Sequence, residues 1–293
     1  MNTVLLEFSA IFAFLLVLGY FVPAGSFYWL YHVRQRDLEP IQSRQPTAAQ
    51  IKREIQLSVS TVFIFAVMTT GLYQLYKSGH TSIYWNFRDY PIGYFPVSVF
   101  LCLVVHDTFF YWTHRFMHWR PVFKYMHLGH HRSVAPTPWA IFAFQPAEAV
   151  VQFLCIASLV LFLPLHPLAF LLFLWIDTQV NTAGHTGYEM VPKFISQHPF
   201  FRGLNTVTHH DGHHTNMNKN FGSFFNVWDR WMGTLMEDEE IVAANHKPAA
   251  AAHKPQRQHD LGEEKRTEAP LPQPSGSHFA GGISKRYARA RHH

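Results

Sequence analysis

Eight histidines of this 293-residue chain fall in three short clusters whose spacing suits metal binding. The clusters are HRFMH at residues 114–118, HLGHH at 127–131 and HDGHH at 210–214. On an α-helix, an HxxxH pair places two imidazoles on one face, and an HxxHH triplet spreads three over an arc of about 100°. One such arc can serve two metal ions. Protonated imidazoles at this density would repel one another and buried neutral ones would each need a partner, so the clusters indicate a metal site.

A ninth histidine, His185, ends the last apolar block of the chain and is placed to complete the ligand set. His106 and His209 are ambiguous. His106 lies two turns before His114, roughly 12 Å along a helix axis, which is too far for one close ligand shell without a bend. His209 points about 100° away from His210 and is not needed to complete the triplet. Four isolated histidines are interpreted as ordinary polar residues near a membrane surface: His32, His80, His166 and His198.

The clusters adjoin apolar segments, and a bilayer crossing takes about 20 such residues. Residues 8–31 and 55–76 carry no charge, and residues 90–105 begin a third span that reaches full length only by continuing through the first cluster. A fourth block, 149–176, is uncharged but is interrupted by LPLHP at residues 163–167. It is short for two full helices, so two short spans and a re-entrant hairpin both stay open. Either one returns the chain to the side that it left.

The basic residues that flank the spans predict their orientation. Five Lys or Arg residues lie in segment 32–54, whereas segment 77–91 holds two. We therefore expect segment 32–54 to face the cytosol, and counting spans from there places every histidine cluster on the same side. The predicted fold is all-α. It is an integral membrane helical bundle of four to five spans or hairpins, with a cytosolic helical cap that carries the three histidine boxes.

Charge and cysteine content exclude other classes of protein. The formal net charge of +5 comes entirely from residues 245–293, with nine Lys or Arg against four Asp or Glu, so it does not indicate nucleic-acid binding. That tail is rich in Pro, Ala, Gly and charge, and we expect it to be disordered. The two cysteines, Cys102 and Cys155, lie in apolar runs and provide neither a disulfide framework nor a thiolate metal site.

Four stretches together resemble the fatty acid hydroxylase/sterol desaturase superfamily: HDTFFYWTHRFMH, HLGHH, GHTGYE and HHDGHHTNMNKNFGSFFNVWDRWMGTL. The resemblance covers roughly residues 55–240, and the boxes stand in the family's order, each after a hydrophobic segment. It implies a non-haem diiron centre, with two iron ions as cofactor and O2 as co-substrate. The ligands that it implies are His114, His118, His127, His130, His131, His210, His213 and His214, with His185 as a ninth.

The resemblance also implies an activity and partners. Members hydroxylate or desaturate an unactivated C–H bond of a lipid from the cytosolic face of the membrane. No fused cytochrome b5 is visible, because His198 and Pro199 are followed by two phenylalanines rather than the glycines of a haem-binding HPGG motif. Electrons are therefore expected from a separate donor of the ferredoxin or cytochrome b5 type with its reductase. Three parts are expected: a first transmembrane helix with a basic cytosolic loop (1–54), the membrane diiron domain (55–244) and the basic tail (245–293).

Ligating histidines normally donate their second N–H to a carboxylate or a carbonyl. Four acidic residues near the boxes are candidates for this supporting role: Asp107, Asp177, Glu189 and Asp211. Asp107 precedes His114 by one heptad on nearly the same face of a helix, and Glu189 follows His185 by one turn if that helix continues. Gly187 makes such a continuation unfavourable.

Two other interpretations of the histidines stay open. Zinc also binds imidazole, but a hydrolytic zinc site needs few ligands, an open water position and usually a glutamate base, and the sequence contains no HExxH motif. A membrane metal-binding or transport protein without oxidase activity, or a paired-histidine haem protein, would place its histidines at membrane depth inside the bundle. The sequence does not choose between hydroxylation and desaturation, nor among sterols, fatty acyl chains and other lipids.

Overall fold

The computed structural model describes residues 3–34, 39–196 and 198–245, and the tail expected to be disordered lies outside them. The α-helices are α1 (Thr3–Phe14), α2 (Val22–Tyr28), α3 (Ala48–Lys77), α4 (Tyr94–Met117), α5 (Arg120–Met126), α6 (Leu128–His131), α7 (Pro146–Phe162), α8 (Pro167–Gly184), α9 (Lys193–Ser196), α10 (Val207–Thr215), α11 (Val227–Met232) and α12 (Asp238–Asn245). Short π-helical and 3-10 segments are η1 (Leu15–Phe21), η2 (Trp29–Arg34), η3 (Phe87–Asp89) and η4 (Pro138–Ala140). The predicted all-α class is confirmed, because only isolated β-bridges accompany the helices of the described part.

Three helical segments of the described chain are long and apolar enough to cross a membrane: Thr3–Arg34, α3 and α4. They coincide with the three uninterrupted spans predicted from the sequence. Their outer faces expose large apolar side chains, such as Phe14, Phe63 and Phe100, which a lipid environment would cover. The chain is therefore a membrane protein. The third span does continue through the first histidine cluster, because α4 ends only at Met117.

The interrupted apolar block forms a helical hairpin. Each helix begins with a proline at its first position, where no backbone N–H is required, and α7 and α8 have 17 and 18 residues. The turn between them is bonded to the segment that follows α3, since Ser82 N–H donates to the Val160 carbonyl and Leu165 N–H donates to the Ser82 carbonyl. The hairpin therefore reaches the end of the bundle where α3 finishes, and it returns the chain to the end where it began. α4 packs against both of its helices.

The basic loop between the first two spans is shorter than predicted. Helical structure continues to Arg34 and resumes at Ala48, where the Thr47 hydroxyl caps α3 by accepting the Gln50 N–H. Lys52 therefore lies in the first turns of α3, because the hydroxyl cap and the helix-forming residues after it extend the apolar helix outward. The expected boundary between residues 54 and 55 falls inside this helix. The division into residues 1–54, 55–244 and 245–293 stays a prediction.

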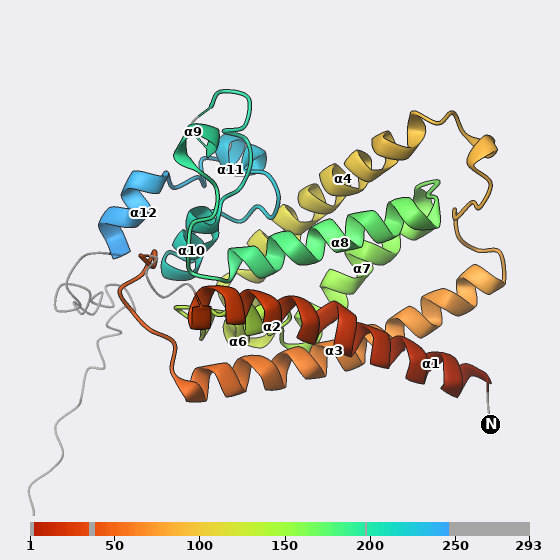
Figure 1. The fold of residues 1–293 in the computed structure, drawn as a ribbon, viewed down its shortest axis with the longest axis horizontal. Helices are drawn as coiled ribbons and strands as arrows, with labels where there is room; N and C mark the ends of the chain where they lie inside the picture. Colours follow the sequence, from red (N-terminus) through yellow and green to blue (C-terminus); the bar gives the residue numbers. More distant parts are fainter. Residues whose placement is uncertain (1–2, 35–38, 197, 246–293) are drawn as a thin grey trace, which may run out of the picture. The chain divides into compact units, whose positions relative to one another are not determined.

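The histidine clusters lie at one end of the helical bundle, where α4 ends and α3 begins, and α9 to α12 gather there (Figure 1). Side chains of α3 tie its first turns to the segment after α6. Gln50 Nε2 donates to the Ala135 carbonyl at 2.7 Å, and an Arg53 guanidinium nitrogen donates to the Ser133 hydroxyl at 3.2 Å. These contacts place the second histidine box beside the start of α3.

Candidate metal centre

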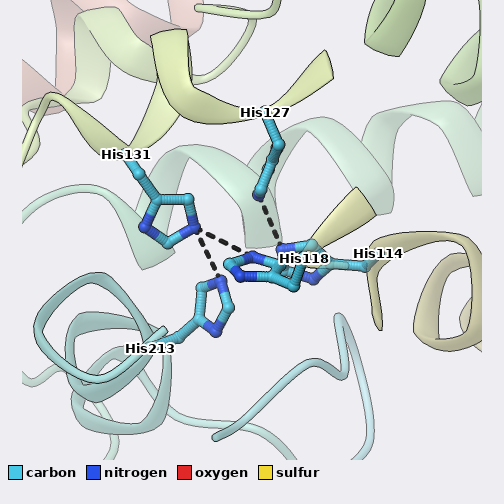
Figure 2. A group of neighbouring side chains, drawn as sticks. All are labelled: His114, His118, His127, His131 and His213. Carbon is cyan, nitrogen blue, oxygen red and sulfur yellow. Dashed lines mark hydrogen bonds between the residues drawn. The ribbon is translucent and has the colours of Figure 1, made fainter. Parts of the chain in front are cut away.

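The structure brings all nine predicted histidines together in two adjacent groups. The first group holds five imidazoles, those of His114, His118, His127, His131 and His213 (Figure 2), and the second holds four, those of His130, His185, His210 and His214. Within each group, one nitrogen from every ring lies within 4.8 Å of the others. The groups are neighbours, because the ring centroids of His131 and His214 are 5.1 Å apart.

Four parts of the chain supply these rings. The first box occupies the last turn and C-cap of α4, His185 is the C-cap of α8, and the third box lies on α10. The second box is not one continuous helix, since His127 has φ of −131° and separates α5 from the single turn of α6. Each HxxHH triplet is divided between the two groups, with one or two rings in each. The arc of imidazoles therefore serves two positions.

Hydrogen bonds define which ring nitrogen faces inward. The Nδ1 atoms of His114, His185 and His213 lie 2.9, 2.7 and 2.7 Å from the backbone carbonyls of Phe221, Asn181 and Lys219. A carbonyl oxygen only accepts, so each Nδ1 carries the proton and each Nε2 presents a lone pair. These Nε2 atoms point at other rings, with His213 Nε2 3.0 Å from His131 Nε2 and His185 Nε2 3.2 Å from His210 Nε2.

At His127 a carboxylate, rather than a backbone carbonyl, accepts the Nδ1–H and fixes the tautomer. Glu148, on the first turn of α7, places Oε1 2.6 Å from His127 Nδ1. With Nδ1 donating to the carboxylate, His127 Nε2 presents its lone pair to His114 Nε2, which is 2.9 Å away. Two lone pairs at this separation repel each other unless a cation lies between or beside them. This donor set therefore fits a bound metal ion.

Burial keeps the imidazoles in the neutral form that binds metals. Burial, with the neighbouring imidazoles adding to its effect, lowers the pKa well below its ordinary value for the rings of His127, His130, His131, His210, His213 and His214. Imidazole nitrogens suit divalent iron, copper, nickel and zinc. Nine of them around two adjacent points fit a dinuclear centre better than a single four-coordinate zinc ion.

The four acidic residues expected to support the ligands have other partners. Asp107 accepts the backbone N–H groups of Ser223, Phe224 and Phe225 through Oδ1, at 3.1, 2.7 and 3.1 Å. It therefore holds the loop whose Phe221 carbonyl binds His114, and it acts on the histidine through backbone rather than by direct contact. Asp177 accepts the Asn181 amide and lies 3.9 Å from the ambiguous His106. The heptad spacing predicted that Asp107 lies on the same face of α4 as His114, but its carboxylate binds the backbone of residues 223–225 instead of the imidazole.

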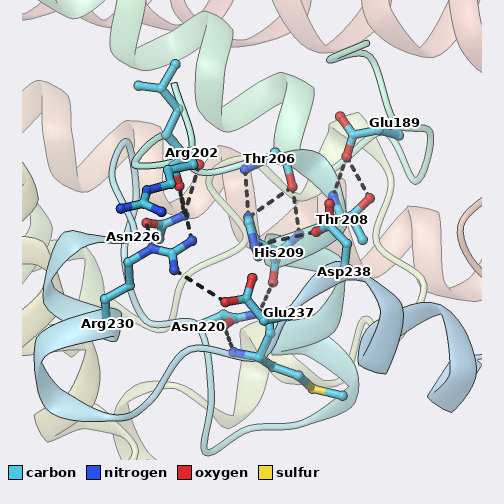
Figure 3. A network of polar contacts seen from close by, with 12 residues as sticks. Glu189, Arg202, Thr206, Thr208, His209, Asn220, Asn226, Arg230, Glu237 and Asp238 are labelled. Carbon is cyan, nitrogen blue, oxygen red and sulfur yellow. Dashed lines mark hydrogen bonds and ion pairs between the residues drawn. The ribbon is translucent and has the colours of Figure 1, made fainter. Parts of the chain in front are cut away.

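Glu189 and Asp211 position α10 rather than an imidazole. Glu189 Oε2 accepts both the N–H and the hydroxyl of Thr208 in the first turn of α10 (Figure 3). It does not lie on the helix of His185, because α8 ends at Gly184 and the chain turns through Gly187, with φ of 76°, before it reaches Glu189. Asp211 accepts the side-chain amides of Gln42 and Asn245 at 2.6 and 2.8 Å. Among the described residues, Glu148 is the carboxylate that contacts a ring of either group, and the sequence analysis missed it. The available signal was a single acid directly before an uncharged apolar block.

His106 and His209 both lie outside the two groups. His209 completes a capping box at the start of α10, because the Thr206 hydroxyl accepts its N–H and its Nδ1 accepts the Thr206 N–H (Figure 3). His106 is buried in α4 and packs against Phe173 and Phe224. The structure thus assigns both histidines to local packing and capping.

A cavity of about 150 Å³ reaches the four-imidazole group. Its walls include Phe110 of α4, Val180 near the end of α8, Met190 in the following loop, and Val207 and His210 of α10. The lining is mainly apolar, and Val180 is partly exposed on the outside of the bundle. A hydrocarbon group that occupies this cavity would meet the four-imidazole group at His210.

Comparison with known proteins identifies the family. The sequence profile described as fatty acid hydroxylase matches residues 99–234. Lathosterol oxidase from Homo sapiens is 31% identical over 222 residues, which cover 75% of this chain and 71% of that protein. The chain belongs to the fatty acid hydroxylase/sterol desaturase superfamily. Two further relatives are the Delta(7)-sterol 5(6)-desaturases ERG3B of Gibberella zeae, 31% identical over 63% of this chain and 56% of that protein, and erg31 of Schizosaccharomyces pombe, 32% identical over 65% and 61%.

No solved structure gives a significant match to this member of the superfamily. Its matched segment, 99–234, contains all nine histidines of the two groups and Glu148. The family resemblance stated from the histidine boxes is confirmed, and the protein is an oxidoreductase that acts on lipids. This assignment excludes the transporter and zinc-hydrolase interpretations of the clusters.

Proposed function

We propose that the two imidazole groups each hold one non-haem iron ion, and that the protein uses O2 and two supplied electrons to desaturate a sterol-like lipid. The observation that carries this proposal is the convergence of nine imidazoles, seven buried and two partly buried, on two adjacent points. Their inward-facing lone pairs need cations, and imidazole is a ligand that iron accepts well. The cavity beside His210 gives a lipid carbon access to the centre.

When bound, the iron pair supplies the reduction of O2 and the oxidant for an unactivated C–H bond. The chain contributes orientation and exclusion of water. Carbonyl groups and Glu148 set the ring tautomers, and the apolar walls formed by Phe110, Val180 and Val207 hold the hydrocarbon in a dry site. In a desaturation, two C–H bonds break and one C=C bond forms, while O2, two electrons and two protons become two water molecules.

The names of the relatives support the substrate class. Lathosterol oxidase and the Delta(7)-sterol 5(6)-desaturases share about 31–32% of their aligned residues with this chain. A sterol or a similar polycyclic lipid is therefore the proposed substrate, and removal of two hydrogens is the proposed reaction. Hydroxylation is the second candidate, because the matching family profile is described as fatty acid hydroxylase.

Lipid analysis of cells with and without the protein tests this function. Cells that lack sterol desaturation are supplied with a Δ7-sterol and express either the natural chain or the His130→Ala variant. With the natural chain we expect a product two hydrogens lighter and iron bound to the purified protein. With the variant we expect no product and a lower iron content. A product heavier by one oxygen would establish hydroxylation instead. No sterol product from an iron-loaded protein would refute the substrate assignment.

We also propose that the histidine end of the bundle faces the cytosol, where a separate ferredoxin or cytochrome b5 type donor can reach it. Labelling of introduced cysteines with a membrane-impermeant maleimide tests the topology. Arg132→Cys and Asn218→Cys probe the second and third boxes, and the exposed His80→Cys probes the opposite end. The natural Cys102 and Cys155 are buried and should react little. Labelling of Arg132→Cys and Asn218→Cys from opposite sides would disprove a single centre.

A further inference from the structure

Glu148 is a buried acid with an unusual set of partners. It lies on the first turn of α7 with none of its surface exposed. Its Oε1 atom is 2.6 Å from His127 Nδ1, and its Oε2 atom is buried without a hydrogen-bond partner. No Lys or Arg among the described residues forms an ion pair with it. A carboxylate in this position needs a positive charge from another source.

The compensating charge is available on the other side of the His127 ring. His127 Nε2 belongs to the five-imidazole group, so a cation held there faces Glu148 through one imidazole. Burial of an ionised carboxylate next to a neutral ring alone is costly, whereas burial beside a bound cation is compensated. The start of α7 also favours a negative side chain, but a helix terminus supplies only partial charge. Helix capping therefore does not account for the complete burial.

The carboxylate is specific to one of the two groups. The Nδ1 atoms of His114 and His213 bind neutral carbonyls, and so does that of His185 in the four-imidazole group. Within the described residues, no carboxylate is hydrogen-bonded to a ring of the four-imidazole group. The two metal positions therefore have different electrostatic surroundings.

We propose that Glu148 is a positioning residue that holds His127 as its Nδ1–H tautomer and supplies the negative charge that tunes the metal in the five-imidazole group. This inference rests on the proposed iron centre. A hydrogen-bonded carboxylate makes an imidazole a stronger donor through its other nitrogen and restrains the ring. Removal of the negative charge should weaken the more oxidised state of the nearby metal more than the reduced state. The reduction potential of the centre should therefore rise.

Two substitutions separate the charge from the hydrogen bond. Glu148→Gln keeps an oxygen that can accept the His127 Nδ1–H and removes the charge, whereas Glu148→Ala removes both. Glu54→Gln is the matched control, because Glu54 is equally buried but accepts from Gln50 and Thr137 and contacts no imidazole. Each full-length variant is purified, loaded with iron and compared by metal content after chelator treatment and by reduction potential.

We expect Glu148→Ala to bind metal about 10–100-fold more weakly at one position, so that one of two iron ions is lost to the chelator. Glu148→Gln should keep both ions and show a higher reduction potential, and Glu54→Gln should match the natural protein in both measurements. If Glu148→Ala does not fold, the reduction potential of the nearly isosteric Glu148→Gln still tests the role of the negative charge.

Natural affinity and potential in Glu148→Gln would overturn the inference and leave Glu148 as a helix cap. An equal shift in Glu54→Gln would overturn it too, since the effect would then follow from any buried glutamate. Failure of the natural protein to bind iron is a different result, because it refutes the proposed function itself.

Discussion

Asp107 holds together the part of the site that is most distant in sequence. Its Oδ1 atom accepts three backbone N–H groups from residues 223–225, and Asp229 accepts the N–H groups of Phe221 and Gly222 from the other side of the same loop. This loop presents the Phe221 carbonyl to His114 Nδ1 at 2.9 Å. Asp107→Ala should therefore destabilise the fold and release one imidazole of the five-imidazole group.

The expected loss of folding stability in Asp107→Ala follows from the number of backbone amides that lose their acceptor. A buried polar group without a partner costs about 1–3 kcal/mol, and water can reach some of the three amides, so the substitution should cost roughly 3–6 kcal/mol. At about 2–4 °C per kcal/mol for a domain of this size, the melting temperature should fall by roughly 6–24 °C. Asp107→Asn keeps the accepting oxygen but loses the charge, and charged hydrogen bonds are about twice as strong as neutral ones. It should therefore lose about half as much stability.

Thermal unfolding of the detergent-solubilised protein, followed by tryptophan fluorescence, measures these shifts. Thr113→Ala is the control, because its hydroxyl donates only to carbonyls within α4. We expect it to melt close to the natural protein. A melting temperature for Asp107→Ala within about 2 °C of the natural value, with iron fully retained, would refute the role of this carboxylate in holding the loop.

Three further predictions concern the centre and its surroundings. His185→Ala should abolish lipid oxidation and lower the iron content while the protein stays in the membrane, whereas substitution of the exposed His80 by alanine should change neither. Product formation and iron per protein are measured for both variants, and full activity of His185→Ala would show that the centre is assigned wrongly. Gly222→Ala should lower stability by about 1–3 kcal/mol in thermal unfolding, because its Cβ would collide with the Phe225 carbonyl oxygen; an unchanged melting temperature would contradict the tight loop. Truncation after Asn245 keeps α12 and should leave the bound iron unchanged, so metal loss on truncation would place ligands in the tail.

Sequence patterns were sufficient to predict which histidines lie together and where the three long apolar helices run. An uncharged apolar run of about 20 residues forms a helix whatever surrounds it in a membrane, since its backbone must bond internally. The histidine spacing is equally local, and the division of the third box between the two imidazole groups follows from the helical arc of α10. For these reasons, α4 was expected to end in HRFMH, and nine histidines were correctly expected to meet.

Only the tertiary structure decided which groups hydrogen-bond to the clustered histidines. Glu148 reaches His127 across 21 residues, and Asp107 reaches the loop 223–225 across more than 115. Contacts of this kind depend on how helices pack and how loops return, which no helical periodicity encodes. Buried amides also compete for the same carboxylates as histidine N–H groups do, and at Asp107 and Glu189 the amides are closer. Local spacing therefore identified the imidazoles that converge, while long-range packing selected the carboxylate that faces them.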